Sequence, residues 1–297
     1  MAGAEGPEER EPSRGAGLGP VPGLGYGGPV EERRFVRLEN DEASEDSAPV
    51  AEEVPVAFVY SGRAHAVMMA TPADLEDFAV GFTLSEEVVA ARAEIGSVRV
   101  SPHSRGVELA IEIPAAAVAR LAERTRAISG RTGCGLCGVE AIDDAVREPR
   151  VVASPLAVAP EALWRAGAAL EARQPFNRAT RAVHGAAWAA ADGALRVVRE
   201  DVGRHNALDK VLGALARDGI DASSGFLVVT SRASFELVQK AAAFGVPLLA
   251  AVSRPTGLAV RLAERCGMTL VGLLRGRTAN VYAHPERVRA PFTQEQR

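Results

Sequence analysis

Apolar residues in the first half of the chain fall into short runs separated by turn residues. The runs VPVAFVY and AHAVMMA flank Ser-Gly-Arg, which predicts a hairpin of two strands over residues 54–60 and 64–70. A second strand pair is expected at residues 95–100 and 107–113, and Pro114 opens a helix directly after it. This mixture of short elements predicts a small α+β unit.

A helix is expected between these two strand pairs. The segment Thr71-Pro72-Ala73-Asp74 combines a capping hydroxyl, a proline suited to the first helical position and an acid three residues after the hydroxyl. Apolar residues then follow at a mostly helical spacing, at Leu75, Phe78, Ala79, Phe82 and Leu84.

In the second half of the chain, apolar strands alternate with helical stretches. The strands are expected at residues 186–190, 195–198, 226–229, 246–252 and 268–274. This alternation predicts a three-layer α/β domain built on a partly parallel sheet.

Two consecutive strand–turn–helix units in this half share one pattern. Ser231-Arg232 ends one strand and Ser253-Arg254 ends the next, 22 residues later. Gly245 and Gly267, which follow the intervening helices, have the same spacing. We therefore expect the two Ser-Arg turns to lie together at the carboxyl ends of neighbouring parallel strands, where open α/β sheets usually bind ligands.

Composition divides the chain further. Residues 1–50 are rich in Gly, Pro and acidic side chains, so we expect a disordered tail that buries too little surface to fold. Residues 51–128 are assigned to the small α+β domain. Residues 129–297 are assigned to the α/β domain, which opens with a cysteine loop.

The bulk properties exclude several classes of protein. A net charge of −4 gives no global basic field for nucleic acid or an anionic membrane. The N-terminus has no apolar secretory segment, and the longest apolar runs are too short to span a bilayer. Three cysteines, two of them close together, favour reduced thiols and a cytoplasmic location over a disulfide framework.

Candidate chemistry is concentrated in the segment SGRTGCGLCG, which starts at Ser129. Its four glycines predict an accessible loop, and Cys134 and Cys137 can turn to the same side of it. We expect a helix to begin soon after Gly138. Its N-terminus, together with Arg131, would stabilise a thiolate, the species that attacks a sulfur donor.

Other interpretations of the cysteine pair are weaker. A zinc site needs about four ligands, but only Cys266 remains and the histidines show no paired spacing. A thioredoxin-like pair would follow the first strand of a βαβ unit, whereas this pair follows more than a hundred residues. The glycine density argues against buried structural cysteines, while Cys266 ends an amphipathic helix and is expected in the core. Sulfur carriage fits the pair best.

These motifs together resemble a known family. The phrase RTGCGLCG, from Arg131 to Gly138, is similar to the signature of the formate dehydrogenase accessory sulfurtransferases. Further similar blocks follow in the same order over roughly residues 54–289, namely EDVGRHNALDK (200–210), Ser231-Arg232, Ser253-Arg254-Pro255-Thr256 and LLRGRTANVY (273–282).

The resemblance implies a fold, an assembly and an activity. The fold would be like that of cytidine deaminases with a smaller N-terminal part, usually as a homodimer. A cysteine desulfurase would load sulfur onto Cys134 as a persulfide, with Cys137 assisting. The sulfur would pass to the bis(guanine dinucleotide) form of the molybdenum cofactor before its insertion into formate dehydrogenase. Deamination is not implied, because the zinc signature is absent and Gly133 stands in place of its proline.

The resemblance and the residues together suggest where the cofactor binds, with no permanently bound cofactor or metal expected. By resemblance, residues 273–278 line the site, and arginine and helix N-termini in the Ser-Arg turns suit phosphate oxygens. The candidate binding residues are Ser231, Arg232, Ser253, Arg254, Leu273, Leu274, Arg275, Gly276, Arg277 and Thr278.

Several neighbouring residues leave two interpretations open. Arg204 and His205 could reach a phosphate or a partner, but His205 and Asn206 could equally cap the helix they begin. For Lys210, a solvated helix face is at least as plausible as a ligand contact, and for Ser234 we favour capping. Trp164 and Trp188 are expected to pack in the core.

Three functions remain in competition. The leading one is sulfur carriage, and the second is a cofactor-binding chaperone that transfers no sulfur. The third is a deaminase-like hydrolase, which would need a tightly bound zinc ion.

Overall fold

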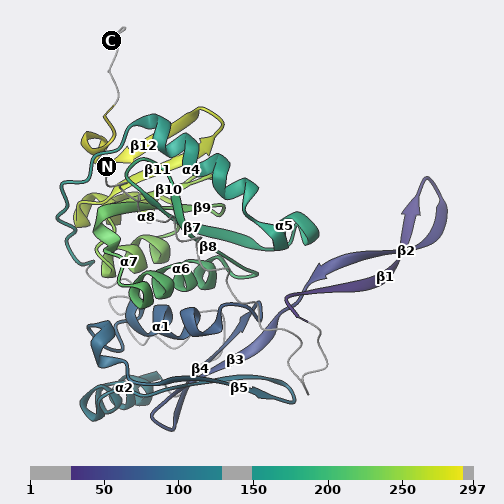
Figure 1. Ribbon diagram of the computed structural model, residues 1–297, viewed down its shortest axis with the longest axis horizontal. Coiled ribbons are helices and arrows are strands. Elements are labelled where there is room, and N and C mark those ends of the chain that lie inside the picture. The colour runs from purple at the N-terminus through teal and green to yellow at the C-terminus, as the bar shows by residue number, and fades with distance from the viewer. Residues whose placement is uncertain (1–27, 129–148, 290–297) are drawn as a thin grey trace, which may run out of the picture.

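The computed structural model describes residues 28–128 and 149–289 of the 297-residue chain, which form two packed parts and a projecting arm (Figure 1). The smaller part contains a four-stranded sheet in the order β4-β3-β6-β5, and the larger part contains a six-stranded sheet in the order β12-β11-β10-β9-β7-β8. The arm is a separate two-stranded ribbon, β1-β2. Within the described ranges, no helix combines the length and the apolar character needed to cross a bilayer.

The smaller part confirms the expected pair of hairpins. Its elements are β3 (Val54–Tyr60), β4 (Arg63–Ala70), α1 (Leu75–Ser85), η1 (Arg92–Glu94), β5 (Val98–His103), β6 (Gly106–Ile111) and α2 (Ala115–Ile128). Residues along β3 alternate between fully buried and partly exposed, as expected for a strand with one face on a core. The buried face packs against α1 through an edge-to-face contact between Phe58 and Phe78, whose ring centroids lie 5.0 Å apart.

The larger part confirms the predicted α/β alternation and adds one strand that the pattern did not reveal, β12. Its strands are β7 (His184–Ala190), β8 (Leu195–Asp201), β9 (Gly225–Val229), β10 (Leu248–Ala251), β11 (Thr269–Arg275) and β12 (Thr278–Ala283). Its helices are α4 (Pro160–Ala172), α5 (Pro175–Thr180), α6 (Arg204–Asp218), η2 (Ala222–Ser224), α7 (Phe235–Ala243), α8 (Gly257–Cys266) and η3 (Pro285–Arg287).

Helices cover both faces of the large sheet. Alternate strand residues such as Leu227 and Leu249 pack with α6, α7 and α8, while their neighbours Val228 and Ala250 pack with α4 on the opposite face. The prediction of an α/β fold is confirmed. The likeness to cytidine deaminases and the exact domain boundaries stay predictions.

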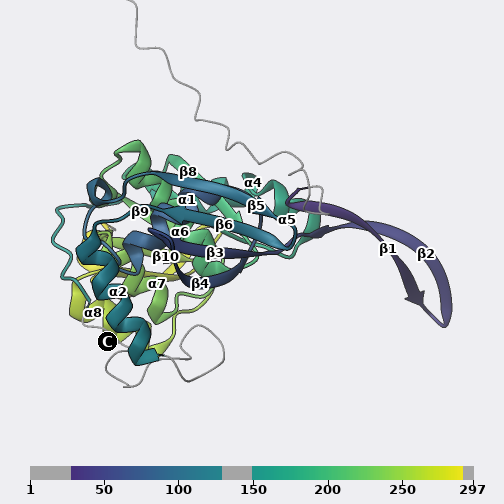
Figure 2. The same ribbon diagram turned by 90° about the horizontal axis from the view of Figure 1, so that it is seen from below.

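The expectation of a disordered tail over residues 1–50 is wrong for residues 30–50. Strands β1 (Val30–Glu39) and β2 (Glu42–Ala51) pair along their whole length and project from the body (Figure 1 and Figure 2). Asn40 and Asp41 connect them with φ angles of 49° and 69°, the left-handed conformation that a two-residue type I′ turn requires. The many charged residues leave no regular apolar pattern that would predict these strands, whereas the turn residues Asn40 and Asp41 are typical of a hairpin. Residues 1–27 of the predicted tail lie outside the described residues.

The two parts meet where α1 crosses α6, and glycine residues allow the backbones of the two helices to come into contact. A Cβ atom on Gly81 would lie 1.7 Å from the backbone oxygen of Asp209, and one on Gly213 would lie 1.8 Å from that of Asp77. Only glycine lets the two backbones approach this closely. In Figure 1, α1 therefore lies between the four-stranded sheet and α6.

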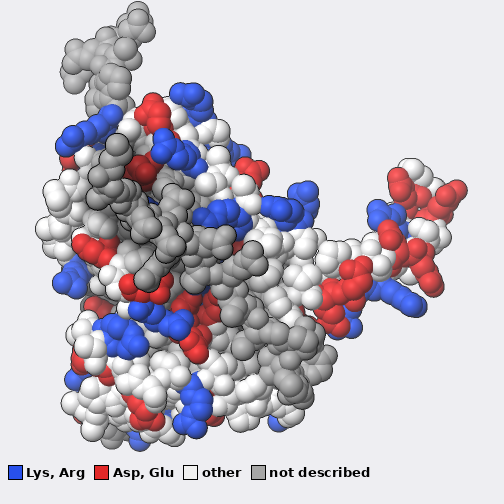
Figure 3. Space-filling view, in the orientation of Figure 1, with Lys and Arg blue, Asp and Glu red and all other residues white. Residues whose placement is uncertain are grey.

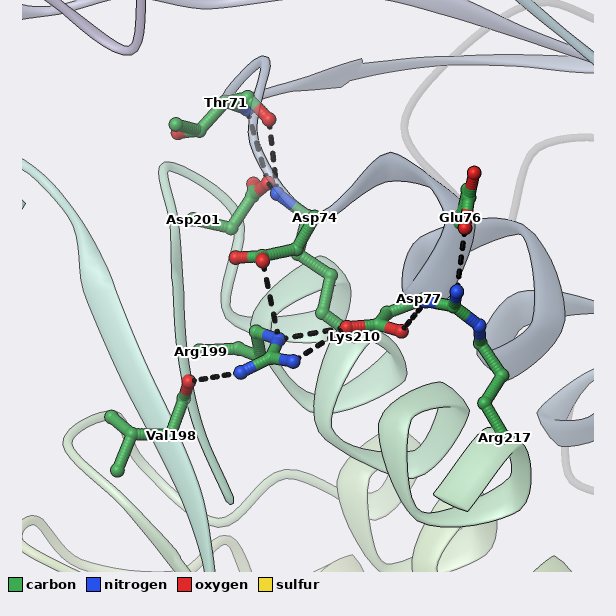
Figure 4. A network of polar contacts seen from close by, with 9 residues as sticks. All are labelled: Thr71, Asp74, Glu76, Asp77, Val198, Arg199, Asp201, Lys210 and Arg217. Atoms are coloured by element: carbon green, nitrogen blue, oxygen red, sulfur yellow. Dashed lines mark hydrogen bonds and ion pairs between the residues drawn. The ribbon is translucent and has the colours of Figure 1, made fainter. Parts of the chain in front are cut away.

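Charged side chains in this interface explain much of the block from Glu200 to Lys210. Lys210 is fully buried, so the prediction of a solvated helix face is wrong; its Nζ atom donates to Asp201 at 2.6 Å and to the carbonyl oxygen of Thr71 at 2.9 Å (Figure 4). Asn206 donates to Asp201 and to the Met69 carbonyl oxygen. Lys210 and Asn206 thus connect the larger part to the smaller one. Neither the capping nor the ligand-contact interpretation of this block had predicted that role.

The N-terminus of α1 differs from the prediction that the Thr71 hydroxyl caps this helix, because Thr71 belongs to the same hydrogen-bond network. The hydroxyl of Thr71 accepts from the backbone N–H of Val202, and its own N–H donates to Asp201. The residue that precedes the helix is instead Asp74, with a φ angle of 53°. Its carboxylate lies 3.4 Å from Arg199, which also pairs with Asp77 at 2.7 Å (Figure 4).

Candidate functional site at the carboxyl edge of the large sheet

Four parallel strands end at one edge of the large sheet. β10 runs parallel to both β9 and β11, and β8 runs parallel to β9 because β7 is antiparallel to both. The turns that follow these strands therefore collect at one edge. They contain Gly203-Arg204, Ser231-Arg232, Ser253-Arg254 and Gly276-Arg277.

Backbone hydrogen bonds join these turns directly. The N–H of Thr256 donates to the carbonyl oxygen of Ala233 at 3.0 Å, which links the turn after β10 to the turn after β9. The N–H of Leu273 donates to the Ser253 carbonyl oxygen at 3.1 Å, which links β11 to the same group. The expectation that the two Ser-Arg turns lie together is thus confirmed.

Arginine side chains dominate this edge and have few protein partners. Arg232, Arg254 and Arg277 are exposed, and the described part of the chain offers them no hydrogen-bond acceptor or carboxylate. Arg275 makes one contact of 3.3 Å, from its Nε atom to the Val252 carbonyl oxygen. Basic side chains are visible over the region of α4, β11 and β12 in Figure 3. Unpaired guanidinium groups beside helix N-termini suit an anionic ligand.

The end of β11 has an unusual backbone. Leu273 has a φ angle of 54°, which costs energy for a branched side chain, and it interrupts the pairing of β11 with β12. A Cβ on the preceding Gly272 would come within 2.8 Å of Pro255 and 3.1 Å of the Ser253 carbonyl oxygen. The strained segment is thus held against the turn after β10.

The predicted binding segment 273–278 divides into core and surface residues. Leu274 is buried at 3% exposure and packs against α4 beside Gly167, so its side chain belongs to the core. Arg275, Gly276, Arg277 and Thr278 are exposed and form the turn between β11 and β12. The hydroxyl of Thr278 donates to the Arg275 carbonyl oxygen and closes this turn.

Ser234 and His205 meet at a carboxylate that the sequence had not singled out. The Ser234 hydroxyl donates to Glu236 at 2.8 Å instead of capping α7, although Ser234 occupies the N-cap position. The His205 Nε2 atom lies 3.2 Å from the same oxygen of Glu236. These hydrogen bonds, that of His205 foremost, lower the pKa of Glu236 to about 2. By contrast, the side chain of Thr256, the N-cap residue of α8, accepts a hydrogen bond from the N–H of Ala259.

His184 begins β7 at the same edge. Burial lowers its pKa, and the nearby Arg204 adds to this effect. The histidine is therefore held neutral near physiological pH. Among the described residues, no three His, Cys, Asp or Glu side chains are close enough together to hold a metal ion.

The cysteines differ in what the structure says of them. Cys134 and Cys137, together with Gly133 and Arg131, lie outside the described residues. Cys266 ends α8 and is fully buried in the core, as predicted, and burial raises the pKa of its thiol. A buried, protonated thiol is a poor nucleophile, so Cys266 is unsuited to sulfur chemistry.

Comparison with known proteins fits the order of these motifs. A model of the FdhD/NarQ family matches residues 51–289. The chain belongs to this family. The resemblance drawn from the motifs is thereby confirmed.

Relatives of the chain share most of its length. The sulfur carrier protein FdhD of Xanthomonas axonopodis pv. citri (strain 306) is 55% identical over 239 residues, which cover 80% of this chain and 85% of that protein. The sulfur carrier protein FdhD of Cupriavidus necator (strain H16) is 52% identical over 239 residues, covering 80% and 83%. A crystal structure of a putative formate dehydrogenase accessory protein from Desulfotalea psychrophila aligns with a TM-score of 0.71 and 26% identity, covering 87% of this chain and 99% of that one.

Proposed function

We propose that this family member is a cytoplasmic sulfur carrier that serves the maturation of formate dehydrogenase. Two kinds of evidence support the proposal. Relatives at more than 50% identity are named sulfur carriers, and the solved structure that aligns with a TM-score of 0.71 is of a putative formate dehydrogenase accessory protein. The chain also carries two cysteines in a glycine-rich segment whose residue types suit an accessible thiolate.

In the proposed reaction, Cys134 takes sulfur from a cysteine desulfurase. The Cys134 thiolate attacks the outer sulfur of the persulfide on the donor enzyme. The donor's sulfur–sulfur bond breaks, and its cysteine leaves as a thiolate while Cys134 becomes the persulfide. Delivery of the outer sulfur to a two-electron-reduced acceptor, which reduces the sulfane sulfur to sulfide as it binds it, breaks the sulfur–sulfur bond and releases Cys134 as the thiolate, and Cys137 assists release. No net oxidant is needed.

The acceptor is proposed to be the molybdenum cofactor in its bis(guanine dinucleotide) form, bound as a substrate at the carboxyl edge. The observation that carries this assignment is the group of exposed arginines Arg232, Arg254 and Arg277, to which the described part of the chain offers no hydrogen-bond acceptor or carboxylate. Arg232 and Arg254 come just before the N-termini of α7 and α8. Pyrophosphate groups are recognised by such arginines and helix N-termini. We further propose a cytidine-deaminase-like fold and a homodimeric assembly, as the family resemblance implies.

The proposal is tested by intact mass measurement after incubation with a cysteine desulfurase and cysteine, followed by peptide mapping. We expect a gain of about one sulfur atom, removable by a thiol reductant, on the peptide that holds Cys134. Cys134→Ala should abolish the gain, and Cys266→Ala should leave it unchanged because Cys266 is buried. No gain in the wild type, with a desulfurase active on another acceptor, would leave a cofactor-binding chaperone as the function.

A further inference from the structure

The arm β1-β2 has an apolar face that the described part of the chain leaves uncovered. Every residue from Glu32 to Ser47 is exposed. Val36 and Leu38 lie on the same face of the ribbon because they are two positions apart on one strand, and Leu38 is directly opposite Ala43. The side chain of Leu38 is 80% exposed. An exposed apolar patch of this kind marks an interaction surface.

The opposite face of the arm makes contacts of its own. Arg37 pairs with Asp46 at 2.5 Å, and its guanidinium carbon lies 5.6 Å from the ring centroid of Phe35. Phe35 and Asp46 are directly opposite each other, on the face that points away from Leu38. A two-stranded ribbon by itself is marginally stable in water, so the face with Val36 and Leu38 needs a surface on which to pack.

A second uncovered apolar surface lies on the four-stranded sheet. One face of this sheet packs on α1, and the other face, called the outer face below, carries partly or fully exposed side chains. Of the eight large apolar residues that are exposed in the described ranges, four lie on the arm and two on β4, so these two surfaces hold most of them. The apolar side chains of the outer face are Pro55, Ala57, Val59, Val67, Met69 and Ala110.

The arm points away from the outer face of its own chain. β2 continues into β3 through Glu52 and Glu53, so the arm extends beyond the start of β3 and away from the body (Figure 1 and Figure 2). Each strand of the arm has ten residues and spans about 33 Å, whereas β3 has seven and spans about 23 Å. The arm of a second copy is therefore long enough to cross the outer face from end to end.

Two-fold symmetry lets both surfaces be covered at once. When an axis perpendicular to the strands relates two copies, each arm lies along the outer face of the other chain. The two surfaces that a single chain leaves uncovered then cover each other twice in the same dimer. A different protein bound to the arm would leave the outer face exposed, so a second copy is the partner that fits both.

Charged residues agree with this arrangement. Glu39 and Glu42 are directly opposite each other at the tip of the arm, where like charges repel, and Figure 3 shows acidic side chains on the arm. The end of the outer face farthest from the arm carries Arg63 and Arg99 together with one carboxylate, Glu112. An arm that crosses the outer face of a second copy brings its acidic tip to these arginines.

We propose that the arm of each chain packs on the outer face of a second copy, with Val36 and Leu38 against the side chains around Val67. The acidic tip then lies beside Arg63 and Arg99. The inference rests on the homodimer of the proposed function, to which it assigns an interface, and it is independent of sulfur transfer.

Light scattering of the full-length protein over a range of concentrations tests the interface, since a dimer has twice the chain mass of 31.1 kDa. Leu38→Asp on the arm and Val67→Asp on the outer face should each raise the dimer Kd about tenfold or more, because each places a charge in the apolar contact. Ser44→Asp adds the same charge to the opposite face of the arm, and Val151→Asp changes another exposed valine. Both controls should dimerise like the wild type.

A mixture of the two interface variants tests whether the two surfaces bind each other. Leu38→Asp keeps an intact outer face and Val67→Asp keeps an intact arm, so their mixture should dimerise more tightly than either variant alone. No recovery in the mixture, or wild-type dimerisation of either variant, would refute this interface and leave the homodimer standing. A monomeric wild type would refute both the interface and the homodimer, whereas loading of sulfur onto Cys134 would be unaffected.

Discussion

Two regions of this molecule are rich in charged side chains: in one the charges are buried and paired, and in the other they are exposed. In the interface between α1 and α6, Lys210 and Asp201 are both fully buried and lie 2.6 Å apart, and Lys240 lies 3.0 Å from Asp209. At the carboxyl edge of the large sheet, Arg254 is exposed with no protein partner among the described residues. Burying a charge is costly unless it is paired, so the first region serves folding and the second is available to a ligand.

The buried region also shows how pairing maintains charge. Burial by itself opposes the positive charge on Lys240, but the nearby carboxylates of Asp209 and Glu86 outweigh this effect and raise its pKa. Lys240 also donates to Ser85 at 2.9 Å, and its Nζ atom lies 5.3 Å from the centroid of the Phe82 ring. Since Ser85, Glu86 and Phe82 come from or adjoin α1, this cation joins the smaller part to the larger one.

The largest effect is expected from closing the space between the two helices. Gly213→Val places a Cβ 1.8 Å from the backbone oxygen of Asp77. The clash can be relieved only by moving the backbone of one helix, which costs packing energy. We expect the free energy of unfolding to fall by more than about 4 kcal/mol, measured by urea denaturation. Gly167→Ala on α4 is the control, because its Cβ meets only the flexible Leu274 side chain at 3.2 Å. Equal stability of the two variants would contradict this account of the interface.

A somewhat smaller loss is expected from removing one buried charge. Lys210→Met leaves Asp201 buried without its cation and should lower the free energy of unfolding by about 3–5 kcal/mol. Adding Asp201→Asn should restore part of that stability, because the remaining group is then neutral. A loss below about 1 kcal/mol for Lys210→Met would show that the pair contributes little.

A much smaller, pH-dependent effect is expected from the carboxylate at the edge. Glu236 has a pKa of about 2, below its ordinary 4.5, so it stabilises the fold above about pH 4.5, and this contribution is lost as the pH falls toward 2. Its side chain is 27% exposed, so Glu236→Gln should cost only about 1 kcal/mol or less at pH 7. Urea denaturation of both proteins from pH 7 to pH 3 should show the difference shrinking below pH 4.5. A difference that stays constant or grows toward acid would contradict the assigned role of Glu236.

The regular pattern of the chain was enough to predict the sheet edge but not the interface. Apolar runs and the 22-residue repeat predicted that Ser231 and Ser253 end neighbouring parallel strands, because each strand and the turn that follows it are marked by local sequence, and successive strand–turn–helix units usually lie side by side. The partners of Lys210 and Asn206 include Thr71 and Met69, which are more than 130 residues away. No local pattern reveals such contacts, so neither of the two interpretations that the sequence left open for Lys210, a solvated helix face or a ligand contact, included burial against Asp201.

Two further differences also have physical causes. The arm escaped prediction because its strands carry many charged residues and are exposed along most of their length, so that no regular apolar pattern marks them and only the Asn40-Asp41 turn does. The hydroxyl of Ser234 was expected to cap α7, but it instead donates to the carboxylate of Glu236 two residues later, a hydrogen bond strengthened by the charge of its acceptor.

The most direct test of the contrast between the two regions is the GDP affinity of Arg254→Gln measured by calorimetry, with the unfolding free energy of the same protein determined in urea. An exposed arginine without a protein partner should leave stability within about 0.5 kcal/mol of the wild type. Losing a phosphate contact should weaken GDP binding about tenfold. Unchanged affinity, or a loss of stability like that of Lys210→Met, would contradict the assignment of the carboxyl edge as the ligand site.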